Sequence, residues 1–177
     1  MNITGGKFNG RKITTGKSND VRPTSSKVRS SIFNMLNSLE IDLETAAFLD
    51  LFAGSGIMGL EALSRGAKKA IFVEKNLNTY KLIKQNLSNF GVEFEAFNMD
   101  ALKFLDKTQE KFDIIFVDPP YMAGLYSLVI EKIQKKQLLD KNGILILETP
   151  LEYQLPQYIT VVKEKKYGDT KIYFVKL

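Results

Sequence analysis

The sequence predicts an α/β fold: a doubly wound, mostly parallel sheet covered by helices, with the last strand antiparallel. Three observations indicate this fold. Short apolar runs alternate regularly with helical stretches, as strands and helices do in parallel sheets. One apolar run leads directly into a glycine-rich turn. Near the C-terminus, two strand-like runs follow each other with no helix between them, which is typical of an antiparallel pair.

The strands of the predicted sheet are the apolar runs. Five of them are expected at residues 47–52, 69–74, 93–98, 112–118 and 143–148. Uninterrupted apolar stretches such as 114–117 and 144–147 are typical of strands that are buried on both faces. Helices are expected between the strands, at residues 57–65, 76–89, roughly 100–107 and 124–138. The runs 158–167 and 171–177, separated by Gly168 and Asp169, predict a hairpin.

A small hairpin-helix extension is expected at residues 1–40, ahead of a larger domain at 41–177. Residues 3–15 predict a hairpin or two short strands, with Asn9 and Gly10 in the turn. Thr24 or Ser25 can cap the helix that follows. Apolar residues at spacings of three and four define the face that packs on the larger domain: Val28, Ile32, Met35, Leu36 and Leu39. Lys27 and Arg29 lie outside that face and are expected to be exposed to solvent.

The composition is that of one globular domain. A chain of 177 residues can bury a full core, and its 44% apolar and 25% charged content is ordinary. No apolar run approaches a membrane span and the N-terminus has no signal-peptide pattern, so a cytoplasmic location is expected. The chain has no Cys and no His. Thiolate nucleophiles, imidazole bases and most zinc sites are therefore excluded, and no metal is expected.

The positive charge is concentrated at the N-terminus. The net charge is +5, and residues 1–40 hold seven basic side chains against two acidic ones, so the rest of the chain is neutral. A local basic excess favours an anionic partner, most simply a nucleic acid. The alternative is a lysine-rich surface that only contacts solvent.

The glycine-rich turn follows the apolar run 48–52. Gly54, Gly56 and Gly59 form a G-x-G-x-x-G pattern. The first two glycines allow a tight turn and a close approach of the backbone to a ligand, and the third lets the next helix pack against the strand. The pattern is weak by itself, because ordinary surface turns also contain Gly-Ser-Gly.

Acidic residues at the other strand ends strengthen this interpretation. Ligands bind outside the carboxyl ends of parallel strands, so Glu74, Asp100 and Asp118 are expected at the same edge as the glycine turn. Glu74 comes about 20 positions after Gly54, where a carboxylate accepts hydrogen bonds from ribose hydroxyls. Asp100 and the Ala101 amide can hold an adenine. Since a pyrophosphate would be repelled by these acids and by Asp50, a cationic sulfonium such as S-adenosyl-L-methionine is the better ligand.

The most specific motif is Asp118-Pro119-Pro120-Tyr121. Two prolines fix the backbone and remove two N–H donors, which leaves carbonyl acceptors beside the Asp118 carboxylate. A site with acceptors and without donors is suited to an amino group. Tyr121 offers a flat face on which a base can stack. We therefore expect these four residues to hold an aromatic amine and direct its nitrogen at a methyl group.

Together these motifs make the sequence similar to a known family. The resemblance is carried by Gly5-Gly6, Gly10-Arg11, Arg22-Pro23-Thr24, Val28-Arg29, Ile32-Phe33-Asn34, the runs 50–56 and 59–67, Asp118-Pro119-Pro120-Tyr121 and Tyr167-Gly168-Asp169-Thr170. The sequence resembles class I S-adenosylmethionine-dependent methyltransferases with a D-P-P-Y motif, and among them the bacterial RsmD-type enzymes that methylate guanine N2 in small-subunit (16S) ribosomal RNA. It departs from them at Ser30 and Asn76, where acidic residues are often found.

The resemblance implies a seven-stranded, Rossmann-like sheet and an N-terminal arm that contacts RNA. The expected cofactor contacts are Asp50, Phe52, Gly54, Ser55, Gly56, Glu74, Lys75, Asp100, Ala101 and Asp118. The expected RNA contacts are Lys7, Arg11, Arg22, Thr24 and Arg29. The expected partner is ribosomal RNA within an assembling small subunit, with the protein acting as a monomer and without a membrane.

Three other functions stay open at this point. The acceptor motif also suits a DNA adenine or cytosine amino-methyltransferase, although the short chain lacks room for a separate DNA-recognition domain. A catalytically idle RNA-binding module would have the same scaffold, but the intact Asp118 and Tyr121 argue against it. A nicotinamide-dependent dehydrogenase would bind NAD in place of S-adenosylhomocysteine.

Overall fold

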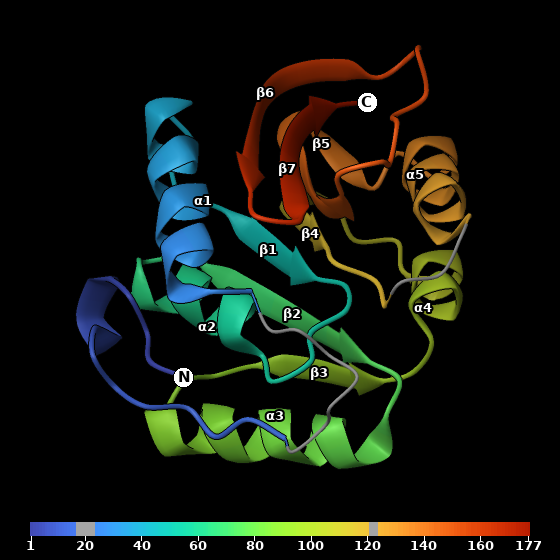
Figure 1. The fold of residues 1–177 in the computed structure, drawn as a ribbon. Helices are drawn as coiled ribbons and strands as arrows, with labels where there is room; N and C mark the ends of the chain where they lie inside the picture. Colours follow the sequence, from blue (N-terminus) through green and yellow to red (C-terminus); the bar gives the residue numbers. More distant parts are fainter. Residues whose placement is uncertain (17–23, 121–123) are drawn as a thin grey trace.

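The computed structural model describes residues 1–16, 24–120 and 124–177. Within these ranges, seven strands form one sheet in the order β3-β2-β1-β4-β5-β7-β6 (Figure 1). Neighbouring strands among β1 to β5 are parallel, and β7 is antiparallel to both β5 and β6. The strands are β1 (Ala47–Asp50), β2 (Lys69–Glu74), β3 (Glu95–Asn98), β4 (Phe112–Val117), β5 (Leu139–Pro150), β6 (Thr160–Tyr167) and β7 (Thr170–Lys176). The predicted fold class and the C-terminal hairpin are confirmed.

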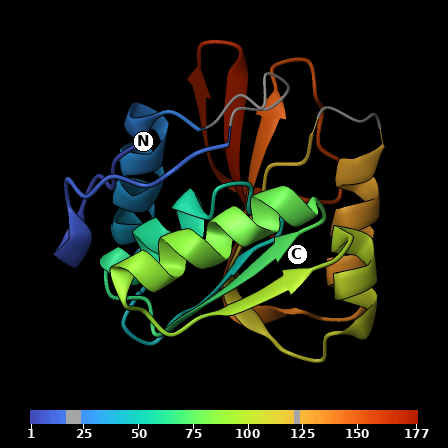
Figure 2. The ribbon, with the colours of Figure 1, turned by 90° about the horizontal axis from the view of Figure 1, so that it is seen from below.

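Helices cover both faces of the sheet. The described ranges contain α1 (Ser26–Ser38), α2 (Ile57–Ser64), α3 (Leu77–Phe90), α4 (Ala101–Lys107) and α5 (Leu125–Lys135). The first three pack on one face, and α4 and α5 pack on the other (Figure 2). Successive strand residues alternate between the two cores: Phe48 joins the α1 side and Leu49 the α4 side. Burial on both faces explains the continuous apolar runs in the sequence.

Most strand limits lie within two residues of the prediction, and the largest shift is at the start of β5. β3 begins at Glu95 and not at residue 93. β5 begins at Leu139, well before residue 143, because Leu139 pairs with Phe112 before the register shifts to Ile144 and Ile114. The exposed polar stretch 140–142 hides this early start in the sequence.

The N-terminal segment folds back on itself in the predicted antiparallel way, but without regular strands. Among the described residues, Asn2 and Lys12 form an isolated antiparallel bridge, and Gly6–Phe8 form a short 3-10 helix, η1. Gly6 has a φ of 74°, and a Cβ at this position would lie 1.8 Å from the carbonyl oxygen of Ser64. The segment therefore pairs along its own length, with the amide of Ile3 donating to the carbonyl of Arg11 (3.0 Å), and its turn packs tightly against the end of α2.

The helix α1 is capped and oriented as predicted. The hydroxyl of Ser25 accepts a hydrogen bond from the amide of Val28 (3.3 Å). The apolar face of α1 is buried against the sheet, in a core that also contains Ile3 and Ile13. The N-terminal residues thus share a core with the strands. The division of the chain at residue 40 stays a prediction.

Candidate active site

The carboxyl ends of β1, β2 and β3 lie side by side. The amide of Gly54, after β1, donates to Oε2 of Glu74 at the end of β2 (3.0 Å). The side-chain amide of Asn98, at the end of β3, donates to the carbonyls of Glu74 and Lys75, each at 2.9 Å. Lys75 Nζ lies 3.5 Å from Oδ2 of Asp100. The structure therefore brings these predicted cofactor residues together at one edge of the sheet.

The glycine turn has the geometry that its sequence predicts. Gly54 and Gly56 have φ values of 53° and 81°, which side chains with a Cβ rarely adopt. A Cβ on Gly59 would lie 2.2 Å from the ring of Phe72, so only glycine lets α2 pack this closely on β2. Ser55 is half-buried, and its carbonyl accepts a hydrogen bond from Nδ2 of Asn86 (3.0 Å). The turn is thus held by contacts on both sides.

Glu74 is held in place by backbone amides. Its Oε2 accepts from Gly54, and its Oε1 accepts from Asn76 at 2.7 Å. Each carboxylate oxygen has two lone pairs, so both retain capacity for a further donor. The carboxylate is therefore preorganised beside the glycine turn, and it can still accept hydrogen bonds from a diol.

Asp100 begins α4 and caps it. Its Oδ1 accepts from the amides of Leu102 (3.0 Å) and Lys103 (3.3 Å). Oδ2 is on the side of Lys75, and the Asp100 side chain is about one-third exposed. Ala101 is buried at the first position of α4. Helix capping accounts for one oxygen of Asp100, and the other is accessible to a ligand amino group.

Asp50 lies underneath the glycine turn. It is 1% exposed, and its Oδ2 accepts the amide of Gly59 (3.0 Å). Burial raises the pKa of Asp50 to about 7, the Gly59 hydrogen bond opposes this shift, and the charge of Glu74 adds to it. Phe52 is half-buried against the α4 side of the core. Asp50 therefore supports the turn from below, and the turn separates it from bulk solvent.

Asp118 directly follows β4 and is half-buried. Burial raises the pKa of Asp118 well above its usual value, and the charges of Glu148 and Asp50 raise it further. Pro119 is buried and Pro120 is exposed. Tyr121 lies outside the described residues. The three neighbouring carboxyl groups give this part of the edge a strongly acidic character.

Glu148 is a residue of this site that the motifs did not indicate. β4 and β5 are parallel with Val117 opposite Leu147, so the next residues along, Asp118 and Glu148, are neighbours. Glu148 is only 7% exposed, and its Oε2 accepts the hydroxyl of Thr24 (2.9 Å). In the sequence Glu148 follows an apolar run, as Glu74 does, but only the register of β4 and β5 places it beside Asp118.

The expected RNA contacts fall into two groups. Lys7 and Arg11 are exposed, and the guanidinium of Arg11 lies over the ring of Phe90 at 4.1 Å and donates to the carbonyl of Asn89 (2.8 Å). Their charges therefore face solvent, as an RNA contact requires. Arg22 lies outside the described residues.

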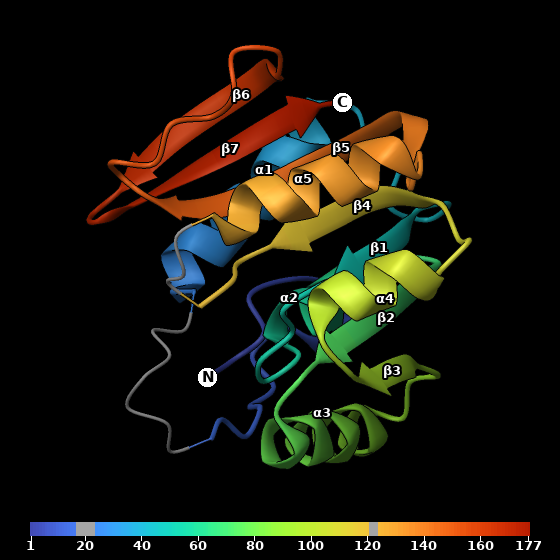
Figure 3. The same cartoon turned by 90° about the vertical axis from the view of Figure 1, so that its right-hand side faces the viewer.

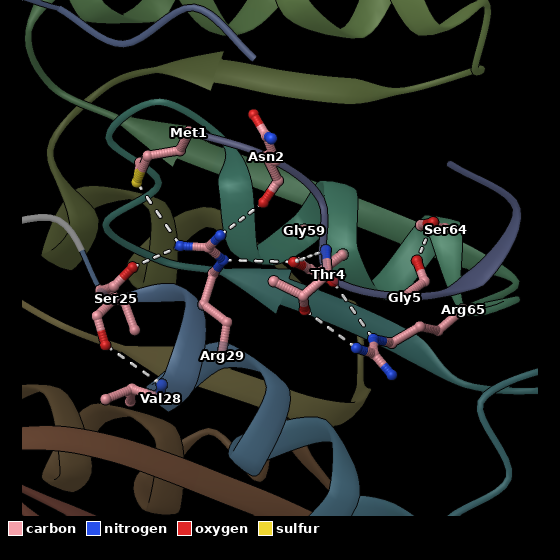
Figure 4. A network of polar contacts seen from close by, with 12 residues as sticks. Met1, Asn2, Thr4, Gly5, Ser25, Val28, Arg29, Gly59, Ser64 and Arg65 are labelled. Carbon is pink, nitrogen blue, oxygen red and sulfur yellow. Dashed lines mark hydrogen bonds and ion pairs between the residues drawn. The ribbon is translucent and has the colours of Figure 1, made fainter. Parts of the chain in front are cut away.

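Arg29 and Thr24 form the second group, and the expectation that Arg29 faces solvent is wrong. The Arg29 side chain is 1% exposed and lies 3.3 Å from Oε1 of Glu61. Its remaining nitrogens donate to the carbonyls of Thr24 (2.6 Å) and Asn2 (2.7 Å) (Figure 4). Burial lowers the pKa of Arg29, and the hydrogen bond and charge of Glu61 oppose that shift. Thr24 is also buried, with its hydroxyl donated to Glu148.

No group of three or more acidic side chains in the described ranges is arranged to hold a metal ion. Within the same ranges, no helix combines the length and apolar character that a membrane crossing requires.

The family model described as Conserved hypothetical protein 95 matches residues 1–176. The chain belongs to this family. Its curated relatives include proteins named "Ribosomal RNA small subunit methyltransferase D". Together with the family match, they confirm the resemblance to RsmD-type proteins. The one from Haemophilus influenzae is 34% identical over 175 residues, covering 95% of this chain and 89% of the relative. The one from Escherichia coli K12 is 34% identical over 157 residues, covering 88% of this chain and 78% of the relative.

Solved structures agree with the fold of this Conserved hypothetical protein 95 member. A "putative methyltransferase yhhF" from Escherichia coli has a TM-score of 0.86 and 31% identity, covering 99% of this chain and 96% of that chain. A hypothetical protein from Thermus thermophilus has a TM-score of 0.87 and 29% identity, covering 100% and 99%. These relatives and structures support a methyltransferase built on the class I fold.

Proposed function

We propose that the protein transfers a methyl group from S-adenosyl-L-methionine to the exocyclic N2 amine of a guanine in small-subunit ribosomal RNA. The observation that carries this proposal is the shared edge of the sheet. There the glycine turn follows β1, Glu74 ends the neighbouring β2, and Asp118 follows β4 on the other side of β1. The names of the relatives support ribosomal RNA as the substrate class. We further propose that the protein acts in the cytoplasm, as a monomer, on an assembling subunit.

The residues of this edge fit a nucleoside that carries a positive charge. Glu74 keeps acceptor capacity for two ribose hydroxyls, and one oxygen of Asp100 is accessible to an adenine amino group. The acidic groups Asp50, Asp118 and Glu148 favour a cation over a pyrophosphate. When bound, S-adenosyl-L-methionine supplies an electrophilic methyl group that is attached to a positively charged sulfur.

The remaining chemistry is positioning of the amine. Asp118 and the carbonyls of its two prolines accept hydrogen bonds from the amine hydrogens, which directs the nitrogen lone pair toward the methyl group. The nitrogen would form a bond to the methyl carbon as the bond from that carbon to sulfur breaks, which leaves neutral S-adenosylhomocysteine. The alkylated aromatic amine is acidic and would then release its proton to water. The charge of Glu148 raises the pKa of Asp118 and so favours the neutral carboxyl, and a bound cation would oppose that effect by favouring the ionised form.

The test is incubation of the protein with methyl-labelled S-adenosyl-L-methionine and unmodified small-subunit RNA or 30S particles, followed by nucleoside analysis. The expected product is N2-methylguanosine. Label in DNA amines would favour the DNA methyltransferase. RNA binding without any incorporation would favour the idle module, and tight binding of NAD in place of S-adenosylhomocysteine would favour a dehydrogenase.

A further inference from the structure

A hollow of about 310 Å³ lies between the start of α1 and the turn that joins β6 to β7. Ser25 and Lys27 line it from the helix, and Lys166, Tyr167 and Gly168 line it from the hairpin. The two sides are connected directly, because the hydroxyls of Ser31 and Tyr167 are hydrogen-bonded to each other. The hollow is therefore a fixed feature of the surface and not a gap between independent segments.

Lysines outnumber acidic residues around this hollow, where the β6–β7 turn also carries the exposed Asp169. Lys27, Lys163, Lys165 and Lys166 are all exposed, and α1 carries no acidic residue along its whole length. Among the described residues, none of these four lysines takes part in an ion pair. The nearby acid on β6, Glu164, is paired with Lys171 at 3.1 Å.

Lys163 and Lys165 lie on the α1-facing side of β6, and Lys166, on the other face of this edge strand, lines the hollow at one end. Lys163 Nζ donates to the hydroxyl of Ser38 at the end of α1 (2.8 Å), and Lys165 Nζ lies 5.4 Å from the ring centre of Tyr167. α1 and β6 lie next to each other over this length (Figure 1). We call the surface formed by Lys27, Lys163, Lys165 and Lys166 the lysine strip.

One end of the lysine strip lies at the edge of the sheet that holds the candidate active site. β7 is antiparallel to β5, so the β6–β7 turn lies at the carboxyl end of β5, where Thr170 pairs with Pro150. Glu148 is two residues earlier on the same strand, and it binds Thr24, which directly precedes the capping residue of α1. Figure 3 shows the β6–β7 turn and the end of β5 at the same side of the sheet. A chain of phosphates that leaves the active-site edge can therefore continue along the strip.

We propose that the lysine strip binds the sugar-phosphate backbone of RNA on one side of the target nucleotide. This inference rests on the proposed function and adds to it a second contact region, remote in sequence from Lys7 and Arg11. The overall charge count conceals the strip, because residues 41–177 are neutral as a whole, whereas the fold brings three of their lysines close to α1, the helix that carries Lys27. Unpaired, exposed cations next to a catalytic edge are what a polyanion recognises without regard to sequence.

The test compares two variants that lose the same charge. The first replaces Lys27, Lys163, Lys165 and Lys166 by Gln. The control replaces four exposed lysines at the opposite end of the strands, which make no ion pair among the described residues: Lys111, Lys135, Lys141 and Lys176. A third variant keeps Lys163, since that side chain contacts Ser38.

RNA affinity is measured against salt concentration with the unmodified small-subunit RNA, and S-adenosylhomocysteine affinity and melting temperature are measured in parallel. For the strip variant, the slope of the logarithm of the RNA binding constant against the logarithm of the salt concentration is expected to become shallower by about 2–3 units. At moderate salt this variant is expected to bind RNA about tenfold more weakly or worse. The control is expected to behave as the wild type. Equal losses in both variants, or no loss in the strip variant, would overturn the inference.

The outcome separates this inference from the proposed function. If the wild type methylates RNA and the strip variant does so with an unchanged KM, the lysine strip is only a solvated surface and the proposed function stands. If the strip variant shows a raised KM with an unchanged kcat, the strip is a binding surface for that RNA. If the wild type binds RNA through the strip without methylating it, the binding surface stands and the proposed activity fails.

Discussion

Arg29 and Glu61 form an ion pair in the interior of the protein, with 3.3 Å between Nε and Oε1 and side chains that are 1% and 0% exposed. Glu61 also accepts the amide of Thr4 (2.7 Å) and pairs with Arg65 (3.3 Å). This carboxylate therefore connects α1, α2 and the N-terminal segment in one network (Figure 4). The network fixes the exposed Lys7 and Arg11 relative to the candidate active site.

Arg29→Ala is expected to destabilise the protein strongly. The change leaves the buried Glu61 with one fewer cation and leaves the carbonyls of Thr24 and Asn2 without a donor. Breaking a buried pair of this kind costs about 3–5 kcal/mol, and the remaining Arg65 favours the lower end of that range. Urea unfolding measures the loss. Lys27→Ala, two positions away and exposed, is the control and is expected to change stability by less than about 0.5 kcal/mol. A stable Arg29→Ala protein with a reduced RNA salt slope would restore the solvent-facing role expected from the sequence.

Glu74→Ala is expected to weaken binding of S-adenosylhomocysteine. Each charge-assisted hydrogen bond to a ribose hydroxyl contributes about 1.5–3 kcal/mol at most. Because Glu74 also holds the amides of Gly54 and Asn76, the variant loosens the turn as well. Glu74→Gln keeps one acceptor and is expected to lose less affinity. Calorimetry on the folded variants measures this, with the exposed Glu131→Ala as a control. Wild-type affinity in Glu74→Ala would remove this residue from the site.

Asp118 is expected to act as a hydrogen-bond acceptor and not as an obligate base. Asp118→Asn keeps one acceptor oxygen and is expected to slow methyl transfer by about five- to tenfold. Asp118→Ala removes the acceptor and is expected to slow it by about 10²- to 10³-fold. Single-turnover transfer with saturating cofactor measures both. An Asn variant as slow as the Ala variant would contradict the acceptor role.

The pH dependence of the same reaction gives an independent check of Asp118. Since the pKa of Asp118 is raised, the neutral acid is formed as pH falls, and it resembles Asn in offering one acceptor oxygen. The wild-type rate is therefore expected to fall with pH only to about the rate of Asp118→Asn, whose own profile is flat. A wild-type rate that continues to fall tenfold per pH unit would identify Asp118 as the proton acceptor.

Asp50 is expected to make the ligand-free protein less stable as pH rises. The pKa of Asp50 is about 7 in the folded protein and about 3.9 in an unfolded chain. Between these values the folded state holds a proton that the unfolded state has released, so the free energy of unfolding decreases by up to about 1.4 kcal/mol per pH unit. Below this window both states are protonated, and above it both are ionised.

Asp50→Asn is expected to remove this dependence. The Asn carbonyl can still accept the Gly59 amide, and it does not titrate. Urea unfolding of wild type and variant at several pH values between about 4 and 7 is the measurement. The variant should gain stability relative to the wild type as pH rises. Two curves that stay parallel throughout the window would show that Asp50 keeps an ordinary pKa.

Local patterns were sufficient for much of this fold. The glycines at 54, 56 and 59 correctly indicated a positive φ at two positions and close helix packing at the third. The apolar runs gave the strands, because burial on both faces leaves little room for polar residues. The gathering of Glu74, Asp100 and the glycine turn at one edge followed from parallel topology alone.

Other features depended on partners that are distant in the sequence. Arg29 is charged and was therefore expected outside, but Glu61 is 32 positions away and only the fold brings it close. Asn9 and Gly10 correctly indicated a chain reversal, but the short 3-10 helix before them and the fit of Gly6 against Ser64 depend on the fold. Glu148 was overlooked because its meaning comes from the register of β4 and β5. Such contacts cannot be read from spacing along one chain.

The position of β6 at the end of the strand order leaves one row of its amide and carbonyl groups facing away from the sheet. An open row of this kind can recruit a strand from a second copy of the chain, which leads to edge-to-edge association. Three lysines in this eight-residue strand and a register shift between Val161 and Lys163 oppose such pairing, since like charges repel and an irregular edge fits poorly. The side chains proposed to hold RNA would thus also keep free molecules apart while no RNA covers them.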